Sequence, residues 1–222
     1  MSAKRIQRYK DAANGDTRKA MALYRYNLRL SQEMFTIVSC FEVALRNAID
    51  SLLVPSLGED WLKDSVQDNG IFSNGRMNET RKIIEKAYNR LNRQGNYSHS
   101  KLIAEMEFGV WKYMYSSLQY RATGQCLLRA FPNKPRSSAA VQYNNTYIFN
   151  ELDKVNSLRN RIAHHEPICF RLHEAEIDTS YIINEYQKIQ TLFSWMGIDS
   201  HSMLYGLDHV QSVCTKINSL KV

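Results

Sequence analysis

The sequence predicts an all-α protein in which the helices pack into a single-domain helical bundle. Two observations support this prediction. Apolar residues recur at spacings of three and four along most of the chain, and no run alternates apolar and polar residues for long enough to indicate a strand. Glycine and proline, which interrupt helices, number only 9 and 4 in 222 residues and fall where the apolar periodicity breaks.

These breaks divide the chain into eight expected helices. In chain order, the joints are Gly15, Gly58, Gly70, Gly75, Gly95, Pro132, Pro135, Pro167 and Gly197. The expected helices span residues 3–13, 17–54, 76–93, 101–121, 123–131, 146–166, 174–196 and 201–219. One face of the longest carries the apolar side chains of Met34, Val38, Phe41, Leu45, Ala48 and Leu52. No repeat or linker divides the chain, so residues 1–222 are expected to form one domain.

The composition indicates a cytosolic protein that neither enters a membrane nor needs a metal or cofactor. An apolar content of 44% over 222 residues is enough for a full core. The longest apolar run is interrupted by Glu42, Arg46 and Asp50, and no apolar segment follows the N-terminal Met-Ser-Ala-Lys-Arg. The four cysteines are far apart, which indicates reduced thiols rather than disulfides or a zinc site: Cys40, Cys126, Cys169 and Cys214.

The charge of the chain is compatible with binding of RNA. The formal net charge is +7, the pI is about 9.2, and 13 tyrosines and 3 tryptophans accompany it. Basic residues attract polyanions, and aromatic rings stack on unpaired bases. A soluble basic protein with no nucleic-acid partner explains the same composition equally well.

The segment Leu-Arg-Asn-Arg-Ile-Ala-His-His, residues 158–165, carries the candidate chemistry. Within it, Arg159, Asn160 and His164 form the pattern Arg-Asn, three residues, His. A guanidinium keeps its charge and holds phosphate oxygens, whereas an imidazole moves protons near neutral pH. The pair therefore indicates phosphodiester chemistry, although arginine and histidine at this spacing are also found on solvated helix faces.

Helical geometry separates the two groups. Asn160 and His164 share a face at i and i+4, but Arg159 is about 140° away from His164 on an ideal helix. Three arrangements could bring both groups to one phosphate: the arginine side chain wraps round the helix, the helix loosens before Pro167, or a second chain supplies one of the two groups. Pro167 is expected to end the helix near His164 and His165, where the helix terminus favours a cation.

The motif segment, together with Glu166 and Pro167, resembles the C-terminal signature of the Abi-like (abortive infection) family and is similar to the HEPN ribonuclease motif. Three further blocks resemble the family in the same order, so that the resemblance covers about residues 5–195. The blocks are Ala22–Leu30 with Phe41–Ile49, Asp60–Leu62, and Ala104–Trp111.

The resemblance implies a HEPN-like all-helical fold, a homodimer, and metal-independent RNA cleavage in phage defence or toxin–antitoxin systems. It carries catalytic roles to Arg159 and His164, with Asn160 in support. The expected supporting residues are Glu42, Arg46, Asn47, His165 and Glu166, the last two without a defined role. The ribose 2′-OH would attack the adjacent phosphorus while His164 moves a proton and Arg159 holds the nonbridging oxygens.

Several alternatives remain open at this point. A non-catalytic RNA-binding module would use the same basic residues, and a protein-interaction partner in a defence system would use the motif for stability. An antitoxin or a regulatory protein is a further possible partner. Glu42 and Arg46 also have the spacing of a simple helix ion pair. His164 and His165 point about 100° apart on a helix, which makes joint metal binding unfavourable.

Overall fold

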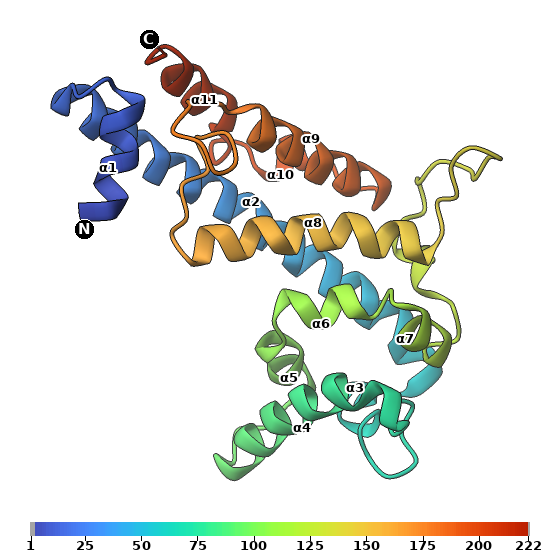
Figure 1. The fold of residues 1–222 in the computed structure, drawn as a ribbon. Coiled ribbons are helices and arrows are strands. Elements are labelled where there is room, and N and C mark those ends of the chain that lie inside the picture. The colour runs from blue at the N-terminus through green and yellow to red at the C-terminus, as the bar shows by residue number, and fades with distance from the viewer. Residues whose placement is uncertain (1–2, 222) are drawn as a thin grey trace. The chain divides into compact units, whose positions relative to one another are not determined.

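The computed structural model describes the backbone of residues 3–221 and the side chains of residues 6–221, and within this range the protein is all-α, as the sequence predicts. It contains eleven α-helices and two 3-10 helices (Figure 1). The elements are α1 (Ala3–Ala12), α2 (Thr17–Leu57), α3 (Trp61–Asp64), η1 (Gly75–Met77), α4 (Asn78–Arg93), α5 (His99–Glu105), α6 (Phe108–Tyr113), α7 (Ser117–Ala122), η2 (Leu127–Ala130), α8 (Asn145–Ala163), α9 (Ser180–Trp195), α10 (Ser200–Met203) and α11 (Val210–Asn218). The β-structure of the described chain is one isolated bridge, Phe170 to Ile177.

The chain forms two compact units. The first, unit A, comprises the residues up to Phe41, then Ser157–Ser194, and those from Ile198 onward. Unit B comprises Glu42–Asn156 and Trp195–Gly197. Three of the four boundaries fall inside the helices α2, α8 and α9, and the fourth lies between Gly197 and Ile198, just after α9. The expectation of a single domain over 1–222 stays a prediction, and residues 1, 2 and 222 lie outside the described range.

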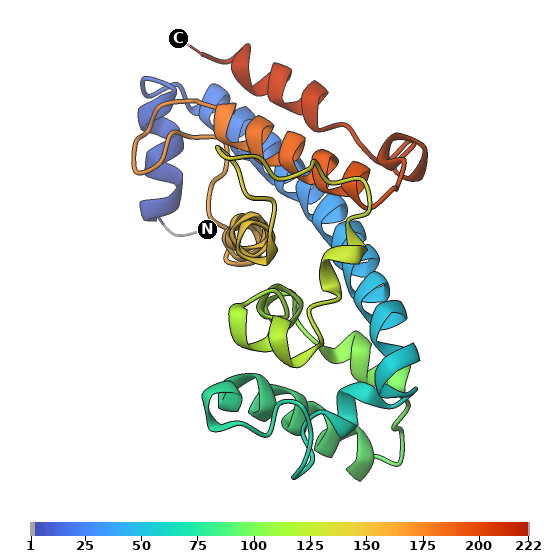
Figure 2. The same ribbon diagram turned by 90° about the vertical axis from the view of Figure 1, so that its right-hand side faces the viewer.

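The core of unit A is built on the first half of α2, with α9 beside it in both views (Figures 1 and 2). The rings of Phe41 and Phe193 meet edge to face at 5.2 Å and join these two helices. Glu33 is a buried carboxylate on α2. It is compensated by Arg29 at 2.6 Å and by the backbone N–H of His209, which donates to it at 3.1 Å. Burial of this charge is tolerable because both contacts satisfy it.

The core of unit B is organised round the carboxylate of Asp50 in the second half of α2. Oδ1 of Asp50 accepts a hydrogen bond from Nε1 of Trp61 at 2.7 Å and another from Nε2 of His99 at 2.8 Å. The carboxylate thus joins α2, α3 and the start of α5. His99 carried no assignment in the sequence, because its partner lies 49 residues away. Nearby, Lys63 and Tyr97 donate to Asp60 and hold the pKa of that carboxyl below its usual value.

The apolar face of α2 is confirmed in its first part and shifts later. Met34, Val38, Phe41 and Leu45 are buried, but Ala48 and Leu52 are only half-buried. Their neighbours Ile49 and Leu53 are fully buried instead. Five turns of 3.6 residues lead from Met34 to Leu52, so burial of Leu53 in place of Leu52 means that the buried stripe turns round the helix by one residue.

Two expected helices in unit B are wrong in extent. The expected helix 101–121 is divided into α5, α6 and α7, because the backbone is extended at Met106, Glu107 and Ser116. The expected helix 123–131 is reduced to the 3-10 helix η2, since Gly124 and Gln125 both adopt positive φ angles. Several short helices show the same apolar spacing of three and four residues as one long helix, so the spacing alone did not reveal these breaks.

Three expected helices that enter unit A also have different ends. The expected helix 146–166 ends at Ala163, and 174–196 begins only at Ser180, where the Asp178 carboxylate accepts the Ser180 N–H at 2.9 Å. The Ser180 hydroxyl also donates to Asp178 at 2.6 Å, and the hydroxyl and the N–H together lower the pKa of this carboxyl at the start of α9. The expected helix 201–219 is broken at Gly206, whose φ of 74° no helix contains. The four cysteines are free thiols, as expected.

Replacing Asp50 with alanine is predicted to lower the free energy of unfolding by about 1–3 kcal/mol, because the N–H groups of Trp61 and His99 would be left buried without an acceptor. Asp68→Ala is the matched control, since this carboxylate is fully exposed and its change should remain within about 0.5 kcal/mol. Denaturant unfolding of both variants measures the difference. Equal effects would contradict the role given to Asp50.

Candidate functional site

The candidate motif lies at the C-terminal end of α8, in unit A. This helix has a buried apolar stripe, formed by Leu152, Val155, Leu158 and Ile162. Burial of this stripe fixes the rotation of α8 and therefore the direction of every other side chain on it. Arg159 and Asn160 are half-buried beside the stripe, whereas His164 is exposed at the end of the helix.

The helix ends in a tight turn that the sequence places correctly but does not describe. The N–H of His165 donates to the carbonyl of Ile162 at 2.9 Å, and the N–H of Glu166 donates to that of Arg161 at 2.9 Å. This pair of bonds defines a Schellman motif with His165 at the left-handed position, where its φ is 55°. Glycine is the usual residue there, so an exposed histidine indicates that the position carries a conformational cost.

The three predicted catalytic residues lie close together at the end of α8, but the side chains of Arg159 and His164 leave the helix in different directions. Residues 159–163 are regular α-helix, and the N–H of His164 still donates to the carbonyl of Asn160 at 2.9 Å. The angular separation of about 140° between Arg159 and His164 therefore holds in the folded chain. Nη1 of Arg159 donates to Oδ1 of Asn160 at 3.4 Å, a long contact that orients the guanidinium only weakly.

Arg161 is a residue of this site that the motif pattern missed. Its Nη2 donates to the carbonyl of Pro167 at 3.0 Å, and its Nε lies 3.4 Å from the carboxylate of Glu166. Its guanidinium also covers the ring of Tyr181 at 4.9 Å. These contacts close the turn that follows His164. Glu166, which the resemblance left without a role, acts in this turn as the ionic partner of Arg161, and the i, i+5 spacing of the two is not a recognised helical pair.

The segment after the turn is anchored by Asn27, which is buried on α2. Oδ1 of Asn27 accepts the backbone N–H groups of Ile168 at 2.9 Å and of Cys169 at 3.2 Å. The bridge between Phe170 and Ile177 follows directly. One side-chain oxygen therefore satisfies two buried donors and sets the path along which the chain leaves the motif.

The thiol of Cys169 shows how tightly this segment is packed. Its side chain is fully buried, and burial raises its pKa to about 12. The thiolate is the reactive form, so this cysteine is chemically inert while the segment stays closed. The ring of Tyr181, beside Arg161, is also desolvated enough to raise the pKa of its hydroxyl.

Glu42, Arg46 and Asn47 belong to unit B, so their predicted support of the motif stays a prediction. The Nε of Arg46 is buried and has no hydrogen-bond partner among the described residues, and Asn47 is exposed. The helix ion pair that the spacing of Glu42 and Arg46 allows stays a prediction.

Groups that could hold a metal were sought among the described residues. They contain no cluster of three or more histidine, cysteine, aspartate or glutamate side chains with the geometry of a metal site. His164 and His165 lie at the C-cap and in the left-handed turn, so neither continues a common helix face. No described helix is both long and apolar enough to cross a bilayer.

Comparison with known proteins gives one match. A protein-family model described as "Abi-like protein" matches residues 2–169, a range that includes α1–α8 and the whole motif turn. The match ends at the segment anchored by Asn27, short of the residue 195 expected from the sequence blocks. Neither the curated proteins nor the solved structures contain a significant match to this chain.

Replacing Asn27 with alanine is predicted to expose Cys169 to thiol reagents. Loss of one acceptor for two N–H groups should lower the free energy of local opening by about 1.4 kcal/mol or more, which raises the labelling rate about tenfold. The measurement is peptide-resolved labelling of the native protein at pH 8. Gln32→Ala, an exposed change on the same helix, is the control. Unchanged protection of Cys169 in Asn27→Ala would show that other contacts hold the segment.

Proposed function

The chain belongs to the Abi-like protein family, and from this premise we propose that it is a metal-independent endoribonuclease that acts in the cytoplasm during abortive infection. One observation supports the step from family to activity. A proton-transfer group, His164, lies exposed where α8 ends, and a permanent cation, Arg159, precedes it by five residues inside the matched range. This is the Arg-Asn-x-x-x-His pattern of HEPN ribonucleases.

The proposed reaction is an internal transesterification of RNA. The ribose 2′-oxygen loses its proton and bonds to the adjacent phosphorus, and the bond from phosphorus to the 5′-oxygen of the next nucleotide breaks. His164 moves the proton, and Arg159 neutralises the charge that builds on the nonbridging oxygens. The products are a 2′,3′-cyclic phosphate and a 5′-hydroxyl. DNA has no 2′-OH and is not a substrate.

Support for the substrate class comes from charge. The net charge of +7 favours a polyanion, and exposed arginines bind phosphate oxygens through paired N–H donors. The proposed role of Asn160 is supporting, since its side chain accepts a long hydrogen bond from Arg159 at 3.4 Å. Arg161 acts differently: it holds the turn rather than the substrate, because its Nη2 already donates to the carbonyl of Pro167 and its guanidinium is ion-paired with Glu166.

Substitution of His164 with alanine is predicted to reduce RNA cleavage by at least about a hundredfold without changing the melting temperature, because the side chain is exposed and outside the core. The assay follows an end-labelled RNA in excess EDTA, which a metal-independent reaction tolerates, and identifies the fragment ends. His201→Ala, another exposed histidine of unit A, is the control and should keep full activity. A folded His164→Ala protein that still cleaves RNA would overturn the assignment, and RNA binding without cleavage by the unmodified protein would favour a non-catalytic module.

The divergence of Arg159 and His164 generates a second prediction, that the working site is shared across a homodimer. An isologous interface brings Arg159 of one chain to His164 of the other. Arg159→Ala and His164→Ala proteins, each inactive, are unfolded together and refolded as a mixture. Random pairing makes about half of the dimers mixed, each with one intact site of two, so about a quarter of the full activity should return. A site built within one chain predicts no recovery when mass measurement confirms mixed dimers.

A further inference from the structure

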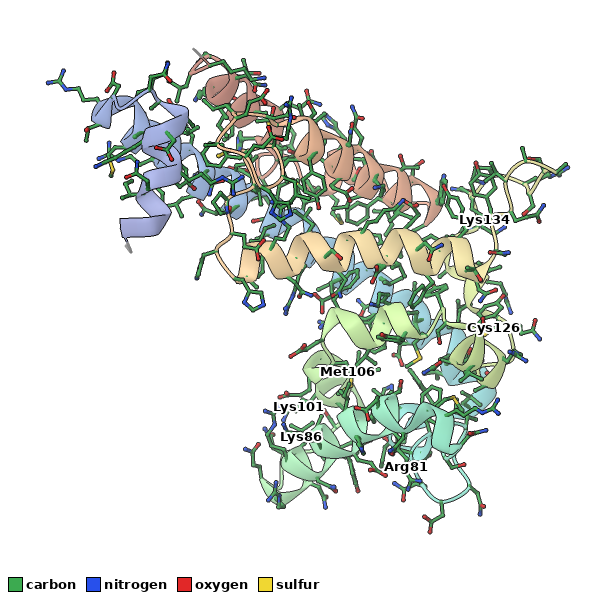
Figure 3. All side chains as sticks on the ribbon, viewed as in Figure 1. Arg81, Lys86, Lys101, Met106, Cys126 and Lys134 are labelled. Carbon is green, nitrogen blue, oxygen red and sulfur yellow. The ribbon has the colours of Figure 1, made fainter. Side chains whose placement is uncertain are left out.

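Unit B contains a cleft that the proposed ribonuclease site does not use. It has a volume of about 670 Å³, within the range of about 300–1,000 Å³ typical of small-molecule sites. One wall is formed by η1 and α4, and the other by the chain from the end of α5 through α6. Figure 3 labels one residue of each wall, Lys86 on α4 and Met106 at the end of α5.

The interior of the cleft is largely apolar. Its apolar lining consists of Met77, Ile83, Ala87, Met106, Val110 and Tyr113. Two of these side chains are large and apolar yet exposed to solvent. The exposed fraction is 47% for Ile83 and 48% for Tyr113. Exposed apolar side chains gathered in a concave site indicate a surface that a ligand covers.

The charges of the cleft favour an anion. Four cations line it, Arg76, Lys86, Arg90 and Arg93, of which Arg90 is paired with Glu105. The other three have no ion-pair partner among the described residues. Of the remaining carboxylates, Glu79 is bonded to Lys82 at 3.5 Å, which leaves Glu107 as the one opposing charge. Three cations against one carboxylate give the cleft a net positive charge.

We propose that this cleft binds a small organic phosphate with a planar apolar body, of which a nucleoside monophosphate is the representative. The guanidinium groups of Arg76 on η1 and Arg93 on α4 suit a phosphate, because a guanidinium presents two parallel N–H donors. The exposed ring of Tyr113 provides a surface on which a base can stack. The thioethers of Met77 and Met106 adapt to different bases. The site is separate from Arg159 and His164 in sequence and stands whether or not the chain cleaves RNA.

Gly109 provides a clean way to close the cleft. It lines the cavity, and a Cβ at this position would meet no heavy atom within 4 Å. Alanine therefore fits without strain, whereas tryptophan occupies the space of a ligand. Because Gly109 lies in the helix α6, either substitution also replaces the residue with one of higher helix propensity.

The experiment is calorimetric titration of the full chain with the four ribonucleoside monophosphates, and with adenosine, inorganic phosphate and octyl phosphate as separate arms. At least one nucleotide should bind about tenfold more tightly than both adenosine and phosphate, since charge and planar body act together. Gly109→Trp should abolish this binding and Gly109→Ala should retain it. Arg159→Ala should also retain it, which separates the cleft from the ribonuclease site.

A second variant keeps the test decisive if Gly109→Trp fails to fold. The double charge reversal Lys86→Glu with Arg93→Glu changes two exposed side chains and should weaken nucleotide binding at least about tenfold. The proposal is overturned if no nucleotide binds at about 1 mM, corresponding to about −4 kcal/mol. It is equally overturned if octyl phosphate alone binds, or if folded Gly109→Trp binds nucleotides as the unmodified chain does.

Discussion

The path of the chain beyond α8 depends on one buried amide, that of Asn27. A buried backbone N–H without an acceptor costs about 1–3 kcal/mol, and the Asn27 oxygen satisfies two of them, on Ile168 and Cys169. The preceding turn is closed from the other side by Arg161, which contacts Pro167 and Glu166. Between these two anchors the motif turn has little freedom, and His164 is left at its exposed edge.

This arrangement divides the structural roles among nine consecutive residues, 158–166. Leu158 and Ile162 bury the helix, Arg161 and Glu166 hold the turn, and His164 is exposed where the helix ends. Exposed side chains can usually be changed at little cost to folding, so the catalytic role proposed for His164 can be tested separately from stability.

The fold class and the apolar faces could be predicted from the sequence because they depend on spacing along the chain. The buried stripes of α2 and α8 are examples. The breaks near Met106 and Ser116 could not, since they depend on which side of the core each short helix covers. The same limit applies to the site. The motif was visible as a pattern, but the contacts of Asn27 with Cys169 and of Asp50 with His99 join residues 142 and 49 positions apart.

The left-handed backbone of His165 determines which substitution selection for stability would favour at this position. Glycine at that position would relieve a cost of about 1 kcal/mol, so folding alone rewards the loss of this histidine. Laboratory evolution that selects only for heat resistance would therefore favour replacement of His165 by glycine. A thermal assay would record this substitution as a gain in stability, whatever its effect on function. Screens of such variants need a functional readout beside the thermal one.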